Sequence, residues 1–332
     1  NGYVYWMVLE LLMSVTTAIV LDKLLKREYP WLKTAASNGD RLRWKYPEII
    51  SKTKQIFFHQ IATFVLLQTS PLIIYAYTSL TLVAIYGNYM LVVIGVSALM
   101  DSLLKSVNAG VGNLVAEGEK DQIKTVFWEL TSLRIWLASI VCFGIYKLGH
   151  SFITLWVGND FLLEQSSFIV LIAITFIGLS RTNDTFLAAY GLFQDVWAPV
   201  TEAILNLGLS ILLGYYYGLT GILSGVLISL LVIVCIWKPF FLYKCGFKEN
   251  IGEYIIRLFK YFALIVVSCI CISWLGDCLF LNSLYSYGQW CLYAFKLLVL
   301  YTLFSLSLFL CLDKASRSYA IRFKLLLTKK VR

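Results

Sequence analysis

The sequence predicts an all-α membrane protein, a polytopic bundle of about nine transmembrane helices. Apolar residues make up 59% of the chain and charged residues only 14%, whereas about a quarter of an ordinary soluble domain is charged. A mean hydropathy of +0.76 over 332 residues is too high for one water-soluble core, because surface-to-volume scaling would leave too much apolar area outside. Lipid must therefore be the solvent, and we do not expect a soluble enzyme.

The predicted helices follow from runs of about 20 apolar residues, the length that crosses a bilayer. These runs lie at 3–21, 56–76, 81–104, 125–147, 164–192, 198–216, 219–242, 257–276 and 288–311. The run 164–192 is too long to lie straight along the membrane normal, so we expect it to tilt or to break near residues 181–184. The joints at 78–80 and 217–219 are short enough to make helical hairpins of the helices on either side.

The lysines and arginines predict which segments face the cytoplasm. If residues 22–55 are cytoplasmic, then so are 105–124, 238–260 and 312–332, and these four segments hold 24 of the 28 basic residues. This distribution also accounts for the net charge of +9, because cations in loops are attracted to anionic lipid of the inner leaflet. Membrane lipid is therefore an expected partner, and nucleic acid is not.

Cysteine and histidine offer little for a metal or redox centre. Most of the eight cysteines lie in or beside apolar spans, where a free cysteine behaves as a small hydrophobic residue. The chain has only two histidines, His59 and His150, and no Cys-x-x-Cys motif. We therefore expect no disulfide framework, no metal site and no cofactor.

Several predicted spans carry polar residues, which are costly in a membrane and usually face a cavity or a partner. Arg181 and Asp184 are three residues apart and share a helix face, and Asn206 follows Glu202 at the four-residue spacing of a single stripe. We expect a hydrated central cavity for a substrate. Its candidate lining residues are Arg134, Arg181, Asp184, Glu202, Asn206 and Gln68.

Two structural explanations compete with this interpretation. Arg181 and Asp184 can pair with each other and simply fix the packing of their helix, since structural ion pairs are common. Glu202 lies close enough to the predicted inner boundary to be a solvated helix end. No catalytic residue is predicted under either interpretation.

Four stretches between about residues 57 and 245 carry a resemblance to a known family. They are LVAIYGNY at 82–89, SVNAGVGNL at 106–114 followed by EGEK at 117–120, FITLWVG at 152–158, and GLF at 191–193 with PVTEA at 199–203 and GLTG at 218–221. In this order and spacing they resemble Wzx-type flippases, which move lipid-linked O-antigen, capsule or exopolysaccharide repeat units. These flippases belong to the MOP superfamily, which also contains the MATE exporters.

The resemblance implies two six-helix lobes around a central cavity, followed by two extra helices. It divides the chain into the last helix of a first lobe (1–21), a cytoplasmic inter-lobe linker (22–55), a second six-helix lobe (56–243), two additional transmembrane helices (244–311) and a basic cytoplasmic tail (312–332). Five helices of the first lobe would then be missing from this sequence, and that N-terminal lobe would be a partner. The implied substrate is an oligosaccharide linked to undecaprenyl pyrophosphate, with Arg134 and Arg181 holding the pyrophosphate. The implied location is the bacterial cytoplasmic membrane.

The sequence also departs from the family pattern. Relatives often carry an aspartate in the first helix of the second lobe, where this chain has Gln68-Thr69-Ser70, so a cation-coupling role at that position does not follow. A MATE-type drug exporter remains an alternative, although it should favour carboxylates over arginines at mid-depth. A membrane polysaccharide polymerase or ligase is a second alternative. It should have a large outer loop with arginines or histidines, whereas the predicted outer loops hold only Lys147 and His150.

Overall fold

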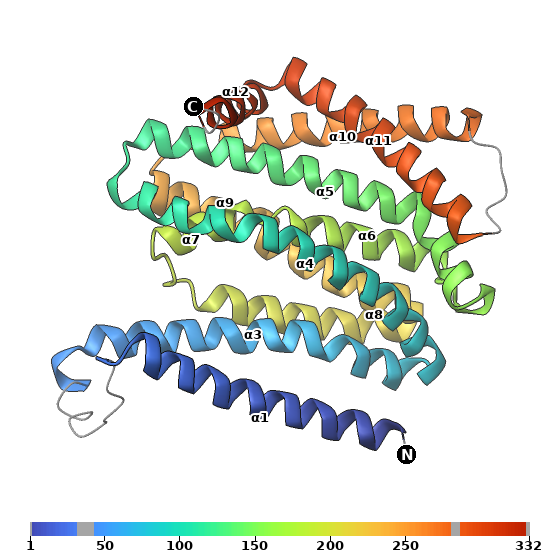
Figure 1. Cartoon of the computed structure of the whole chain (residues 1–332), viewed down its shortest axis with the longest axis horizontal. Coiled ribbons are helices and arrows are strands. Elements are labelled where there is room, and N and C mark those ends of the chain that lie inside the picture. The colour runs from blue at the N-terminus through green and yellow to red at the C-terminus, as the bar shows by residue number, and fades with distance from the viewer. Residues whose placement is uncertain (1, 32–42, 280–285, 330–332) are drawn as a thin grey trace. The chain divides into compact units, whose positions relative to one another are not determined.

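The computed structural model describes residues 2–31, 43–279 and 286–329 (Figure 1). This described part is about 90% helical and contains no β-strand. The chain divides into two units, residues 1–53 and residues 54–332. The predicted linker 22–55 falls mostly in the first unit, and residues 32–42 of it lie outside the described part of the chain.

The first unit contains helix α1 (Gly2–Glu28), a 27-residue apolar helix with no buried residue. At about 1.5 Å per residue, it is long enough to cross a bilayer, and it ends in the basic pair Lys26 and Arg27. Helix α3 (Pro47–Tyr77) begins in this unit and continues into the second. A single helix therefore crosses the predicted boundary between the linker and the second lobe.

The second unit is built around one long central helix, α5 (Lys120–Trp156). Besides the larger part of α3, its other helices are α4 (Leu80–Glu117), α6 (Gln165–Leu179), α7 (Thr182–Ala189), α8 (Trp197–Leu230), α9 (Lys238–Phe241), α10 (Gly252–Leu279), α11 (Tyr287–Leu312) and α12 (Lys314–Lys329). A short 3-10 turn, η1 (Asn159–Phe161), follows α5, and two π-helical segments, η2 (Leu231–Trp237) and η3 (Leu242–Phe247), flank α9. Helix α5 packs against α4, α6, α7, α10, α11 and α12.

The aromatic core of the second unit forms around Phe127 of α5, which is fully buried. Its ring lies 5.1 Å from the ring centroids of both Phe186 and Phe247, in edge-to-face arrangements. Such offset geometries are favoured because the positive ring edge meets the negative ring face. These contacts tie α5 to α7 and to η3, the elements that surround the charged residues described below.

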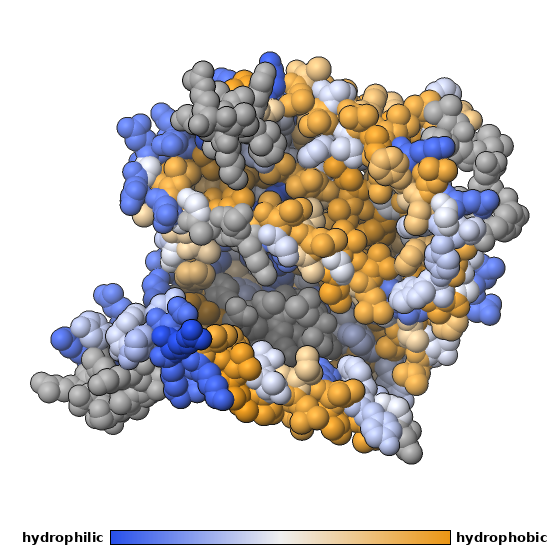
Figure 2. Space-filling model, in the orientation of Figure 1, coloured by the Kyte–Doolittle hydropathy of each residue, from blue (hydrophilic) through white to orange (hydrophobic). Residues whose placement is uncertain are grey.

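The structure confirms an all-α polytopic membrane protein. Seven segments in the described part of the chain are long and apolar enough to cross a membrane. On the face of the second unit seen in Figure 2, hydrophobic residues cover the middle and hydrophilic residues gather toward the two ends of the helices. That distribution suits a bundle whose middle meets hydrocarbon and whose ends meet water.

The predicted hairpin at 217–219 is present and divides the longest of these segments, Trp197–Phe247. Gly218 adopts φ 55° and ψ −135°, a conformation that glycine tolerates because it lacks a Cβ. Beyond it the chain folds back, so that the Ser210 hydroxyl donates to the Ile222 carbonyl oxygen at 2.9 Å. The two arms touch so closely that a Cβ at Gly225 would collide with the backbone of residues 209 and 210.

The joint at 78–80 is also a tight turn between helices. Helix α3 ends at Tyr77, and Ser79 caps α4 by accepting a hydrogen bond from the Leu82 amide at 3.2 Å. Ile74 and Ile85 on either side of the turn share one hydrophobic core, so the adjoining ends of α3 and α4 lie close together. The predicted span 56–76 lies in α3, where many side chains fall outside the described residues. The number of membrane passes therefore stays a prediction.

Candidate functional site

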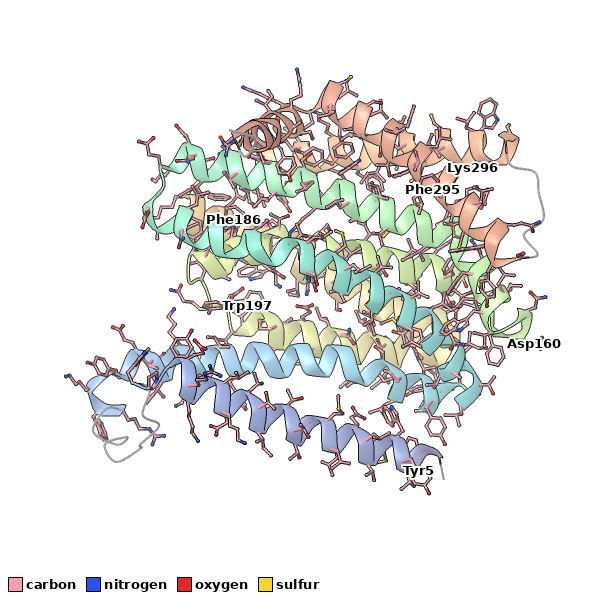
Figure 3. All side chains as sticks on the ribbon, in the orientation of Figure 1. Tyr5, Asp160, Phe186, Trp197, Phe295 and Lys296 are labelled. Atoms are coloured by element: carbon pink, nitrogen blue, oxygen red, sulfur yellow. The ribbon has the colours of Figure 1, made fainter. Side chains whose placement is uncertain are left out.

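The predicted break in the run 164–192 is present, and it positions the first candidate residue. Helix α6 ends at Leu179 and α7 begins at Thr182, with Arg181 as the residue that precedes α7. Helix α7 lies toward the end of the second unit at which α5 begins, where Figure 3 shows Phe186, whereas Asp160 marks the opposite end. The break matters because it leaves backbone groups and a charged side chain within an otherwise apolar span.

Arg181 contacts two carboxylates from different helices. Its Nε lies 3.5 Å from Oδ2 of Asp184, one turn into α7. Its second terminal nitrogen lies 3.6 Å from Oε1 of Glu202 on α8. Asp184 is also bound from a third direction, because Nζ of Lys238 at the start of α9 lies 2.9 Å from its Oδ1.

Arg134 joins this group through backbone and hydroxyl oxygens. One of its terminal nitrogens donates to the carbonyl oxygen of Arg181 at 3.2 Å, and the other donates to Oγ1 of Thr185 at 3.4 Å. The first bond ties α5 to the backbone of the residue that precedes α7. Arg134 therefore helps to hold the break in place.

We call these five residues the charge cluster: Arg134, Arg181, Asp184, Glu202 and Lys238. It contains three basic and two acidic groups, a formal balance of one positive charge. Charges within membrane spans require partners or a polar ligand, because hydrocarbon does not solvate them. In the described part of the chain no set of three or more metal-ligating side chains is placed to hold a metal ion.

The polar stripe of α8 continues inward from the charge cluster. Glu202, Asn206 and Ser210 are all buried, with 3%, 1% and 0% of each residue exposed. Ser210 is bonded to the opposite arm of the hairpin, as described above. By contrast, Oε1 of Glu202 and Nδ2 of Asn206 have no hydrogen-bond partner among the described residues. Unbonded buried polar atoms are costly, so these two atoms are candidates for contact with water or ligand.

A groove of about 610 Å³ opens beside the cluster, between the helix break and α10. Its polar end is formed by residues 180–184, including Arg181 and Asp184. Its long wall is apolar and comes from η2 and α10, where Phe259 and Phe262 are 72% and 61% exposed. The groove can therefore hold an elongated apolar group next to a charged one.

The structure brings together four of the six predicted cavity residues, Arg134, Arg181, Asp184 and Glu202. Asn206 lies one helical turn beyond Glu202 and takes no part in the ion pairs that the structure describes. The side chain of Gln68 lies outside the described residues. Glu202 is not a solvated helix end, since only 3% of it is exposed.

Lys238 is the member of the cluster that the sequence reasoning missed. It belongs both to the basic segment 238–260 and to the predicted span 219–242. That overlap is the signal in the sequence, because a lysine within a span needs an acidic partner and Asp184 lies within another predicted span. The π-helical segment η2 leads directly into this residue, and π-helical turns often occur at functional sites.

No protein-family model, curated protein or solved structure matches this chain. The function must therefore be argued from the residues and their geometry.

Proposed function

We propose that this protein is a flippase that moves an oligosaccharide linked to undecaprenyl pyrophosphate across a membrane, for the synthesis of a surface polysaccharide. The proposal places it in a bacterial cytoplasmic membrane, with the C-terminus in the cytoplasm. The sequence resemblance and the positive-inside distribution of basic residues support these assignments.

The observation that carries the proposal is the pairing of the charge cluster with the apolar groove. A lipid-linked oligosaccharide has an anionic pyrophosphate between a polar sugar and a long hydrocarbon tail. The cluster offers three basic groups, of which Arg181 lies in the groove wall. The apolar residues of η2 and α10 offer a surface for the tail.

Arg181 is the residue best placed to exchange partners. Its contacts with Asp184 and Glu202 are 3.5 and 3.6 Å long, beyond the 2.7–2.9 Å of strong charge-assisted hydrogen bonds. A pyrophosphate can take the guanidinium in a paired, planar contact that neither carboxylate makes here. Asp184 would keep Lys238, which already lies 2.9 Å away. Arg181 could thus bind the pyrophosphate while Asp184 stays paired with Lys238.

Transport then requires the bound head group to change sides. In transporters built from repeats, this is achieved by rocking one helical bundle against another around a central site. The broken joint between α6 and α7 and the π-helical segments beside α9 are the irregular elements next to the cluster. We propose that these elements change their backbone conformation locally when the bundles rock.

The proposal is tested by the binding of a head-group series to the purified chain in nanodiscs. The ligands share one undecaprenyl tail and end in an alcohol, a monophosphate, a pyrophosphate or a pyrophosphate-linked sugar. We expect the pyrophosphates to bind at least about tenfold more tightly than the alcohol, which corresponds to one charge-assisted contact. Arg181→Ala should remove this preference, whereas Arg27→Ala, in the exposed last turn of α1, should leave it.

Two results would contradict the proposal. One is equal binding of the alcohol and the pyrophosphates, which would mean that the charge cluster does not recognise the head group. The other is tighter binding of a cationic amphiphile than of any pyrophosphate. That second result would make Asp184 and Glu202 the recognition groups and would favour a MATE-type exporter.

A further inference from the structure

The C-terminal helix α12 (Lys314–Lys329) differs in direction from the helices that it follows. In Figure 1, α12 is seen close to end-on, whereas α5, α10 and α11 run across the view. Only Asp313 separates it from α11, which is one of the segments able to cross a membrane. A helix that starts where a span ends, and turns across the spans, lies at the level of the membrane surface and along it.

One face of α12 is held firmly on the bundle. Asp313 accepts hydrogen bonds from the Ser316 amide at 2.9 Å and from the hydroxyls of Ser132 and Tyr261 at 3.2 and 3.3 Å. Nζ of Lys260 lies 3.5 Å from the same carboxylate. We call these five residues the Asp313 network. It joins the start of α12 to both α5 and α10.

A second buried carboxylate fixes the next turn of α12. Glu129 of α5 accepts a hydrogen bond from the Ser318 hydroxyl at 2.5 Å, and its Oε1 lies 3.3 Å from Nε of Arg322. Only 4% of Glu129 is exposed. The direction and the rotation of α12 are therefore set by the bundle and do not depend on what covers its outer face.

The outer face of α12 is basic. Lys314, Arg317 and Ile321 are exposed and follow one another at helical spacings of three and four, so they lie on one side of the helix. The sequence from residue 314 to the C-terminus contains seven basic residues and no acidic one. A surface of this kind, lying along the plane of the membrane, is complementary to anionic lipid head groups.

We propose that α12 is an in-plane helix whose outer face, centred on Lys314 and Arg317, binds the anionic phospholipid head groups of the membrane surface. The inner face connects this contact to α5, the helix that also carries Arg134 of the charge cluster. This proposal is independent of the transported substrate. It concerns the lipid that surrounds the protein, and it can fail or hold whatever the chain transports.

Hydrogen exchange of the α12 backbone amides in nanodiscs of two lipid compositions tests the proposal. One composition is phosphatidylcholine alone, and the other contains about 30% phosphatidylglycerol. Each basic side chain near an anionic surface strengthens binding about fivefold. We therefore expect the amides of residues 318–322 to exchange about tenfold more slowly in the anionic discs. Raising the salt from about 0.1 to 0.5 M should reduce the difference, because the Debye length shortens.

Charge-removing variants identify the residues responsible. Lys314→Gln with Arg317→Gln should abolish most of the lipid-dependent slowing. The matched control is Lys120→Gln with Lys248→Gln, which removes the same charge from exposed positions where α5 starts and just before α10. The control should keep the slowing, and so should Lys314→Arg with Arg317→Lys, which retains both charges and checks that α12 still folds.

The proposal would be overturned if α12 exchanged at the same rate in both kinds of disc. Protection independent of lipid charge would point to another occupant of the outer face, such as an acidic protein or a second copy of the chain. The proposal would also be overturned if the Lys120→Gln, Lys248→Gln control lost the slowing of exchange to the same extent. The lipid effect would then depend on the overall charge of the protein and not on α12.

Discussion

Glu202 and Asp313 are both carboxylates with 3% of the residue exposed, yet the protein holds them in opposite ways. Asp313 accepts from the Ser132 and Tyr261 hydroxyls, from the amide and hydroxyl of Ser316, and lies near Lys260. Among the described residues, Glu202 has a single ionic contact, 3.6 Å from Arg181, and its Oε1 accepts no hydrogen bond.

The difference distinguishes a site that stabilises the fold from a site whose polar groups are still able to bind a ligand. Burying a carboxylate is costly unless hydrogen bonds replace its water, and the Asp313 network provides them. The charge cluster does not do so for Glu202, and it also leaves Nε of Arg181 and Nδ2 of Asn206 without hydrogen bonds among the described residues. Buried polar atoms without hydrogen bonds are uncommon in proteins and call for an explanation. We therefore propose the cluster as the substrate site and assign the Asp313 network to stability.

The largest expected effect is therefore on stability, at Asp313. Asp313→Ala should lower the free energy of unfolding by about 3 kcal/mol, because several buried donors lose their acceptor at once. Thermal or denaturant unfolding in detergent measures this loss. Asp160→Ala, at an exposed position in η1, should leave the unfolding free energy nearly unchanged. Equal effects of the two changes would mean that the buried hydrogen bonds of Asp313 do not contribute to the free energy of unfolding.

A smaller loss of stability is expected at Arg181. Arg181→Ala removes the ionic partner of Glu202, while Asp184 keeps Lys238, so we expect a loss of about 1–2 kcal/mol. Adding Glu202→Gln should recover most of it, since a neutral amide no longer needs the guanidinium. The same unfolding assay applied to both single variants and the double variant gives the coupling energy. Strictly additive losses would show that the two side chains do not interact.

The smallest effect should come from Glu202→Gln alone. This change removes a poorly bonded charge and keeps the shape of the side chain, so the unfolding free energy should stay within about 1 kcal/mol of the original value. Asp313→Asn is the matched change in the other region and should cost more, because its amide nitrogen cannot accept the bonds made to Asp313. If Glu202→Gln proved the more damaging of the two, the contrast between the regions would be lost.

Much of the fold followed from local signals in the sequence. The short joint at 217–219 predicted a hairpin, and the length of 164–192 predicted either a tilt or the break that the structure has at residues 180–181. The placement of Arg181, Asp184 and Glu202 together followed from the cost of charge in a membrane.

The remaining features depend on contacts between distant parts of the chain. Lys238 and Asp184 are far apart in sequence, so no local pattern indicates that they pair. Arg134 was expected to face the substrate, but it also bonds to the backbone of the α6–α7 break, which periodicity cannot reveal. The return of α12 onto Glu129 likewise involves residues 189 apart and has no local signature.

The central claim is that Arg181 binds an anionic head group and also stabilises the packing of its helix. The affinity of the Arg181→Ala, Glu202→Gln double variant for a pyrophosphate-linked oligosaccharide lipid tests this most directly, because stability should be nearly restored in that protein. We predict that it binds the lipid at least about tenfold more weakly than the unmodified chain, with Arg181→Lys falling between the two. Undiminished affinity in a folded double variant would contradict the account and leave Arg181 as a packing residue.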